Sequence, residues 1–317
     1  MDEIGRIERR IGLHNLRVLM AVVTAGSMGK AAKILATSQP AVSRSIAELE
    51  HALGVRLVDR GARGIEPTPY GQALLKRGTA VFDELQQGIK DIRSLADPTV
   101  GDLTIGASIA ITEGLICSVI SRLARRYSRL SFQVHATDTA TAYQALLDRK
   151  IDLAVVHLIH PPAEDVMNVE PLLQDPHVVV VGAQNPLARR RRVALAQLME
   201  EPWTLPLADQ PYGSVVHEAF RAQGLAVPPV VVGSTLPLRT ALLMTGQFLS
   251  MVPRVVMQFP PKSRLFKILP IDLAGTARPL ALVTLKNRTL NPAAQIFADA
   301  VRVIAKSLAA GPERSTD

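Results

Sequence analysis

Two patterns of hydrophobic positions divide the chain into a shorter and a longer part. Residues 13–96 place apolar side chains at the spacing of amphipathic helices. After Gly101, short β-branched runs such as Leu153–Val156 and Val178–Val181 alternate with helical stretches, which indicates an α/β sheet with parallel strands. Pro98 and Gly101 disfavour a helix that continues across the change. We therefore predict a helical N-terminal part followed by a larger α/β part.

The N-terminal part contains two short helices joined by a tight turn. Ser27 and Ser38 can cap their first turns, because a serine oxygen accepts hydrogen bonds from the free N–H groups there. The second of these helices has a buried stripe at steps of four, three and four: Val42, Ile46, Leu49 and Leu53. Its other face carries short or hydrogen-bonding side chains, which suit a DNA major groove about 12 Å wide. The spacing predicts a helix-turn-helix, and a helical core fragment without a ligand is the alternative.

A basic turn between two short apolar runs follows these helices. The run Val55–Arg60 leads into a Gly-rich segment that ends near Thr68, with Arg60 and Arg63 close to the predicted tip. This pattern predicts a β-hairpin, or wing. A wing can place its cations along phosphates while the helix contacts bases, whereas a hairpin that only faces solvent is the alternative.

The stretch Ala25–Gly54 closely resembles the helix-turn-helix of LysR-type transcriptional regulators, and Pro67–Gly71 is similar to that family's exit from the wing into a linker helix. Val58 departs from the pattern, because the family usually has phenylalanine there. The resemblance extends over essentially the whole chain and implies binding to double-stranded DNA. The DNA-contacting positions that it implies are Ser27, Lys30, Gln39, Pro40, Ser43, Arg44, Arg60 and Arg63.

A proline-free helical stretch connects the two parts and repeats its apolar residues every seven positions. One series consists of Leu74, Val81 and Leu95, and the other of Leu85 and Ile92. Such a seam favours pairing with a second copy of the chain, and a helix packed on its own domain is the alternative. A two-fold dimer would set two recognition helices about 34 Å apart and would require an inverted-repeat site. The resemblance further implies a homotetramer.

The expected domain organisation has three parts. Residues 11–70 form an all-α winged helix-turn-helix DNA-binding domain, 71–97 a linker or dimerisation helix, and 99–310 an effector-binding domain. By resemblance, this last domain is an α/β two-lobed periplasmic-binding-protein-like fold. We expect its first lobe to comprise residues about 99–160 and 268–310 and its second lobe residues about 166–262.

Polar side chains follow several of the predicted strands. Small ligands in open α/β sheets bind beyond the carboxyl ends of strands, so these positions indicate an effector site for a small organic molecule such as an acid or a sugar. Each hydroxyl taken alone is better explained as a helix cap, and the histidine as a structural one, but their convergence on one edge favours a site. The candidate residues are Ser108, Thr139, Thr141, His157, Thr204 and Thr235.

Composition and net charge say less about the function than the positions of individual residues do. The 36 Lys and Arg residues exceed the 28 Asp and Glu residues and give a net charge of +8, which suits a polyanionic partner. Half of this excess lies beyond residue 96, so bulk charge does not locate the DNA-binding part. The basic run Arg189–Arg192 is interpreted as a solvated loop. Cys117, the single cysteine, excludes an internal disulfide and is expected to be a buried, inert thiol.

The sequence offers little support for an enzyme. It contains no Gly-x-Ser-x-Gly elbow, phosphate loop or His-Glu-x-x-His motif, and its histidines lack metal-ligand spacing. We expect no catalytic residue, cofactor or metal. No secretion signal and no apolar run of about 20 residues is present, which predicts a cytoplasmic protein without a membrane partner.

Together these patterns predict a sequence-specific transcriptional regulator. An effector bound between the two lobes would change how dimers pair and, by resemblance, the contact with RNA polymerase. A small-molecule binding protein that carries a helical extension is the alternative.

Overall fold

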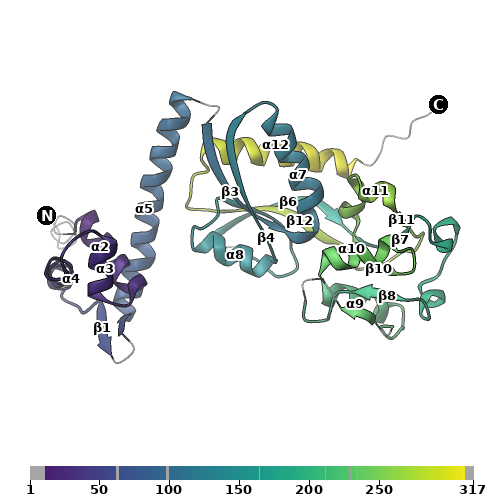
Figure 1. The fold of residues 1–317 in the computed structure, drawn as a ribbon, viewed down its shortest axis with the longest axis horizontal. Helices are drawn as coiled ribbons and strands as arrows, with labels where there is room; N and C mark the ends of the chain where they lie inside the picture. Colours follow the sequence, from purple (N-terminus) through teal and green to yellow (C-terminus); the bar gives the residue numbers. More distant parts are fainter. Residues whose placement is uncertain are drawn as a thin grey trace. The chain divides into compact units, whose positions relative to one another are not determined.

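The computed structural model describes residues 11–61, 64–97, 100–163, 165–210, 212–228, 230–233 and 235–310. The chain separates into two compact units at Gly88, inside the long helix α5 (Figure 1). Each unit has its own hydrophobic core.

Three helices form the body of the N-terminal unit: α2 (Leu13–Ala25), α3 (Met28–Ile34) and α4 (Gln39–Leu53). Gly26 and Gly54 end α2 and α4 with φ of +65° and +69°, a left-handed conformation that glycine adopts without strain. The Ser27 Oγ accepts a hydrogen bond from the Lys30 N–H, and the Ser38 Oγ accepts one from the Ala41 N–H. Both predicted helix caps are therefore confirmed.

The core of this unit fixes the relative placement of α3 and α4. The small side chains of Ala31 and Ala32 are buried where the helices meet, together with Val42, Ile46 and Leu49 of the predicted stripe. Leu53 is only partly buried against this core. Val58, at the position where the family usually has phenylalanine, is buried in the same cluster. The smaller residue is therefore part of the core packing.

The predicted hairpin is present as the antiparallel strands β1 (Val58–Gly61) and β2 (Gly64–Pro67). The Glu50 carboxylate of α4 accepts hydrogen bonds from the Leu57 N–H at 2.7 Å and from the Val58 N–H at 3.3 Å. The Ile65 N–H donates to the Gly26 carbonyl at 3.0 Å. These contacts join the hairpin to the ends of the helices, so the wing and the helix-turn-helix form one structure.

Helix α5 (Pro69–Ala96) presents a stripe of exposed apolar residues. Ile92 is 69% exposed and Leu95 is 83% exposed. Leu74, which the heptad pattern placed in the same seam, packs instead against the core of the helix-turn-helix. We name the exposed positions the α5 stripe; they are Val81, Leu85, Ile89, Ile92 and Leu95.

The first lobe of the larger unit contains a five-stranded sheet. Its spatial order is β4 (Arg129–Thr137), β3 (Val100–Ser108), β5 (Leu153–His157), β12 (Arg278–Leu285) and β6 (Met167–Asp175). Helices α7 (Cys117–Ala124) and α12 (Pro292–Ala309) pack with one of its faces, and α8 (Thr139–Leu147) covers the other. Alternate β5 residues therefore enter two different cores, since side chains on a strand alternate between faces. The short helix α6 (Ile109–Ile111) and the π-helical turn Thr112–Ile116 connect β3 to α7.

The second lobe contains another five-stranded sheet. Its spatial order is β11 (Phe266–Ile268), β7 (His177–Gly182), β10 (Leu249–Pro253), β8 (Trp203–Leu205) and β9 (Val230–Gly233). Its helices are α9 (Gly213–Ala222), α10 (Leu236–Met244) and the short α11 (Lys262–Leu265). Three short 3-10 turns complete the lobe, at Pro186–Arg189, Leu195–Leu198 and Arg254–Gln258.

The two-lobed α/β fold is confirmed, and three details of the sequence interpretation are corrected. Strand β6 pairs with β12 in the first sheet, so the second lobe begins after Asp175 and not near residue 166. Strand β11 pairs with β7, so Phe266–Ile268 belongs to the second lobe. Both sheets are mixed, because β12 and β7 pair antiparallel with their neighbours. The strand–helix alternation in the sequence predicts only parallel neighbours, so it does not foresee these antiparallel pairs.

Two further expectations concern single features. Cys117 is exposed at the start of α7, and the prediction of a buried thiol was wrong. The run Arg189–Arg192 is exposed, as expected of a solvated segment. Within the described residues, no helix is both long and apolar enough to cross a membrane.

The contact between Glu50 and the hairpin leads to a testable prediction. Replacing Glu50 with alanine leaves two backbone N–H groups without their acceptor, and we expect the free energy of unfolding to fall by about 1–3 kcal/mol. Hydrogen exchange at the Leu57 and Val58 amides should become faster. Glu48→Ala, an exposed change in the same helix, is the control. Equal exchange in both variants would contradict the assigned role.

Candidate functional site

The predicted DNA-contacting residues lie at the start of α3, in the first half of α4 and on the wing. Lys30, Gln39, Pro40, Arg44 and Arg60 are exposed, and Ser27 and Ser43 are half-buried. Arg63 lies outside the described residues.

Local contacts bring α3, α4 and strand β2 of the wing together. A side chain added at Gly29 would lie 3.4 Å from the Gln39 Oε1 and 3.9 Å from the Ser27 Oγ, so the first residue of α4 reaches the start of α3. The bond from Ile65 to Gly26 sets strand β2 beside the same point. Within the described residues, Lys30, Arg44 and Arg60 have no ion-pair partner. The surface therefore offers unneutralised cations beside side chains that can bond to bases.

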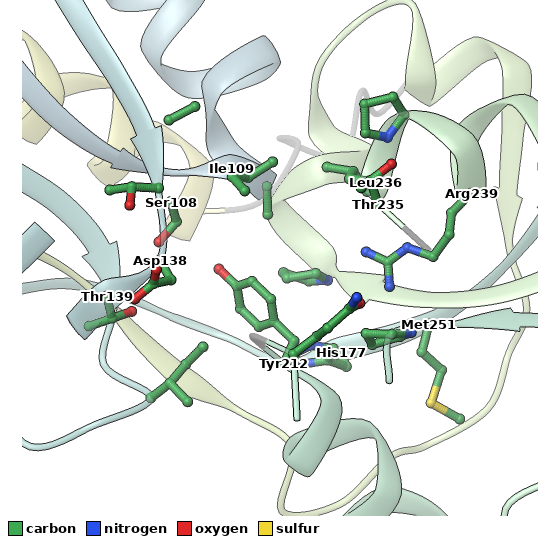
Figure 2. Close-up of a pocket in the computed structure, with 18 residues that line it drawn as sticks. Ser108, Ile109, Asp138, Thr139, His177, Tyr212, Thr235, Leu236, Arg239 and Met251 are labelled. Atoms are coloured by element: carbon green, nitrogen blue, oxygen red, sulfur yellow. The ribbon is translucent and has the colours of Figure 1, made fainter. Parts of the chain in front are cut away.

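A second candidate site is a cavity of about 440 Å³ between the two lobes of the larger unit (Figure 2). The first lobe contributes the carboxyl ends of β3 and β4 and the starts of α6 and α8. The second lobe contributes the segment before α9, the start of α10, and residues of β7 and β10. The lining residues are Ser108, Ile109, Ala110, Ala136, Thr137, Asp138, Thr139, Ile159, His177, Pro206, Gln210, Tyr212, Thr235, Leu236, Pro237, Arg239, Met251 and Pro253.

Three of the six predicted effector residues line this cavity: Ser108, Thr139 and Thr235. Thr141 is exposed on α8, where its side chain donates to the Asp138 carboxylate. Thr204 is fully buried in β8, away from the lining. The structure therefore does not bring all six residues together, because a strand end predicts an edge of a sheet and not the direction of a side chain.

His157 does not line the cavity but supports its wall through a buried hydrogen-bonded chain. The His157 Nε2 lies 2.8 Å from the Asp175 Oδ2, and its Nδ1 lies 2.8 Å from the Tyr212 hydroxyl. The Ser108 hydroxyl accepts a hydrogen bond from the His157 N–H at 3.2 Å. A tautomer with hydrogen on Nε2 satisfies both ring contacts. These hydrogen bonds thus join the first lobe to Tyr212 of the second.

Tyr212 has an unusual backbone conformation at the point where its ring joins this hydrogen-bonded network. Its φ is +69°, which is rare for a residue with a side chain. A side chain at the next residue, Gly213, would collide with the Leu207 carbonyl, so glycine is required there. Burial raises the pKa of Tyr212 well above its usual range, and the hydroxyl keeps its hydrogen at neutral pH.

Arg239 places a buried positive charge at the cavity. The residue is 8% exposed, and its Nε and Nη1 have no hydrogen-bond partner among the residues that the structure describes. Figure 2 shows the guanidinium extending into the space between the lobes, opposite Ser108, Asp138 and Thr139. Burial lowers the pKa of Arg239 to about 10, so the group is still charged at neutral pH.

His177 adds a neutral acceptor to the same wall. Its Nδ1 lies 3.4 Å from the Thr276 carbonyl, which favours hydrogen on that nitrogen. Burial is the main cause that lowers the pKa of His177 to about 4, and the nearby His157 adds to it. The ring is therefore neutral at pH 7. Its buried Nε2 has no partner within the described part of the chain and keeps a free lone pair.

Comparison with known proteins matches both parts of the chain. A model of the bacterial regulatory helix-turn-helix protein, lysR family, matches residues 13–72, and a model of the LysR substrate binding domain matches residues 96–304. The chain belongs to the LysR family. It is a DNA-binding transcriptional regulator with an effector-binding domain.

Curated relatives of this LysR-family chain are similar over most of their length. The transcriptional regulator TdcA of Escherichia coli is 25% identical over 285 residues, 90% of each chain. The uncharacterized regulator YfeR of Shigella flexneri is 29% identical over 306 residues, 95% of this chain and 96% of that one.

Solved structures of full-length regulators share the fold. A full-length OxyR variant from Pseudomonas aeruginosa has a TM-score of 0.64 at 21% identity and covers 92% of this chain and 98% of that chain. CbnR in complex with its target DNA has a TM-score of 0.52 at 22% identity and covers 93% and 100%. The family consists of transcriptional regulators.

Sequence reasoning missed Arg239, His177 and Tyr212. A signal for Arg239 was present, since it is the single charged residue of the otherwise apolar or hydroxylated helix Leu236–Met244. His177 and Tyr212 carry no such local signal, because their partners are far away in the sequence.

Arg239 leads to a prediction about the stability of this regulator. An unpartnered buried charge opposes folding, so Arg239→Met should raise the free energy of unfolding by about 2 kcal/mol. Urea denaturation of the ligand-free protein measures the change. Arg264→Met, at an exposed arginine of the same lobe, should leave it nearly unaltered. A less stable Arg239→Met protein would contradict this interpretation.

Proposed function

We propose that this LysR-family regulator binds an inverted-repeat promoter site as a dimer or tetramer through α4 and the wing. The observation that carries this proposal is the group of exposed, unneutralised cations beside Gln39 and Ser27. Gln39, Pro40, Ser43 and Arg44 start the helix that would enter the major groove, and Lys30 and Arg60 flank it.

The α5 stripe is the proposed dimer seam. Five large apolar side chains exposed along one helix are unfavourable in water, and pairing with the same stripe of a second copy would bury them. Two copies joined in this way carry two recognition helices, which matches a palindromic site.

The cavity between the lobes is the proposed effector site. Its volume suits a small organic molecule, and its walls come from both lobes, so occupation can favour one arrangement of the lobes. A ligand shifts such an equilibrium only by its difference in affinity for the two states. We propose that this shift changes how dimers pair on DNA and how the regulator contacts RNA polymerase.

The recognition helix is tested by Arg44→Ala. Loss of a base or phosphate contact should weaken binding to the promoter about tenfold, as measured by fluorescence anisotropy at two salt concentrations. His51→Ala, an exposed change in the last turn of α4, is the matched control. Equal affinity of the two variants would contradict the assignment of α4 to the major groove.

The dimer seam is tested by Leu85→Glu combined with Ile92→Glu. Placing carboxylates face to face in an apolar seam should shift the protein to monomers in sedimentation velocity and weaken DNA binding. Gln86→Glu adds a negative charge at an exposed position beside the stripe and should leave the oligomer intact. A double variant that sediments like the wild type would exclude α5 as the seam.

A further inference from the structure

The polar groups that face the inter-lobe cavity are unequally satisfied. The Ser108 hydroxyl accepts a hydrogen bond from the His157 N–H at 3.2 Å, and the Thr139 hydroxyl donates to the His157 carbonyl at 2.9 Å. The Asp138 carboxylate caps α8, where it accepts hydrogen bonds from the Thr141 N–H and hydroxyl. These three groups are therefore engaged within the first lobe.

Arg239 is the charged group of this wall that has no such partner among the described residues. The nearby cation Lys262, which lines a small neighbouring cavity with Arg239, is paired with Glu113 at 2.5 Å. No described carboxylate pairs with the Arg239 guanidinium, and its Nε and Nη1 donors are unsatisfied. An unpaired buried charge is costly in the folded protein. A ligand that supplies an anion would remove that cost, which explains why such an arginine is found at a binding site.

The rest of the cavity wall is mostly apolar. Ile109, Ile159, Leu236, Met251 and several prolines line it. Such a wall favours a hydrocarbon body over a sugar, because sugar hydroxyls would lose their water without finding partners.

We propose that the effector is a small organic monocarboxylate whose anionic end binds Arg239 and whose apolar body fills the space between the lobes. This inference rests on the proposed role of the cavity as the effector site. The fork of a guanidinium matches the two oxygens of a carboxylate, which explains why arginine serves here.

Two acceptors of the cavity wall limit the ligand to a single anionic group. The His177 Nε2 is a lone-pair acceptor, and Asp138 is a carboxylate on the opposite wall. A second carboxylate on the ligand would meet one of these acceptors instead of a donor. The site should therefore discriminate against dicarboxylates of the same length.

The test uses two matched sets of probes on the full-length protein. Each set contains a monocarboxylate, its neutral amide and a dicarboxylate: hexanoate, hexanamide and adipate, and benzoate, benzamide and terephthalate. Isothermal titration and thermal shift report binding. In at least one set we expect the monocarboxylate to bind about tenfold or more tightly than the other two members, because only it pairs one charge with Arg239.

Variants locate the contact. Arg239→Met should weaken monocarboxylate binding about tenfold or more, and Arg264→Met should leave it unchanged. Ala136→Trp fills the cavity from an exposed lining position and should abolish binding, whereas Ala140→Trp, exposed on α8 and outside the lining, should not.

The outcomes separate this inference from the proposed function. An amide or dicarboxylate that binds as tightly as the monocarboxylate, an Arg239→Met protein that keeps full affinity, or no monocarboxylate binding at millimolar concentration overturns the inference. If a neutral probe binds and Ala136→Trp abolishes its binding, the cavity remains the effector site and only the ligand class is wrong. If probes bind equally to Ala136→Trp, the cavity itself is not the site.

Discussion

His157 and Asp175 lie 2.8 Å apart in the larger unit, almost completely shielded from water. The His157 Nδ1 also bonds to Tyr212, its N–H donates to Ser108, and the Asp175 Oδ1 accepts the Val255 N–H at 3.0 Å. These residues come from the carboxyl ends of three strands of the first lobe, β3, β5 and β6, and from the second lobe. Since buried polar groups are costly when any partner is removed, this chain constrains how the two lobes meet. The shape of the cavity depends on that constraint.

Arg239 illustrates the opposite arrangement on the facing wall. The hydrogen-bonded chain satisfies the polar atoms of His157 and Asp175, whereas two nitrogens of Arg239 remain unsatisfied within the described residues. The first arrangement stabilises the ligand-free fold, and the second opposes it and reserves binding energy for an anion. Functional sites commonly carry such a local cost to stability. The regulator therefore combines a wall whose polar groups are hydrogen-bonded with a wall whose arginine has no counter-charge among the described residues.

In the N-terminal unit, local contacts determine the placement of the functional side chains. The serine caps start α3 and α4, left-handed glycines end α2 and α4, and Glu50 ties the wing to α4. Each of these contacts spans few residues. The exposed face of α4 is thus set by the same spacing that buries Val42, Ile46 and Leu49.

The sequence by itself determined the helix-turn-helix, its two serine caps, the wing and the apolar repeat along α5, because these features depend on neighbours within one or two turns. It also indicated a two-lobed α/β half. Only the tertiary structure decided that β6 belongs to the first lobe, since its ladder with β12 joins residues more than a hundred positions apart. The same is true of the cavity. His157, Asp175 and Tyr212 meet through folding alone, and a hydroxyl at a strand end such as Thr204 can equally point into a core. Long-range packing, which no local pattern encodes, determined which polar side chains face the cavity.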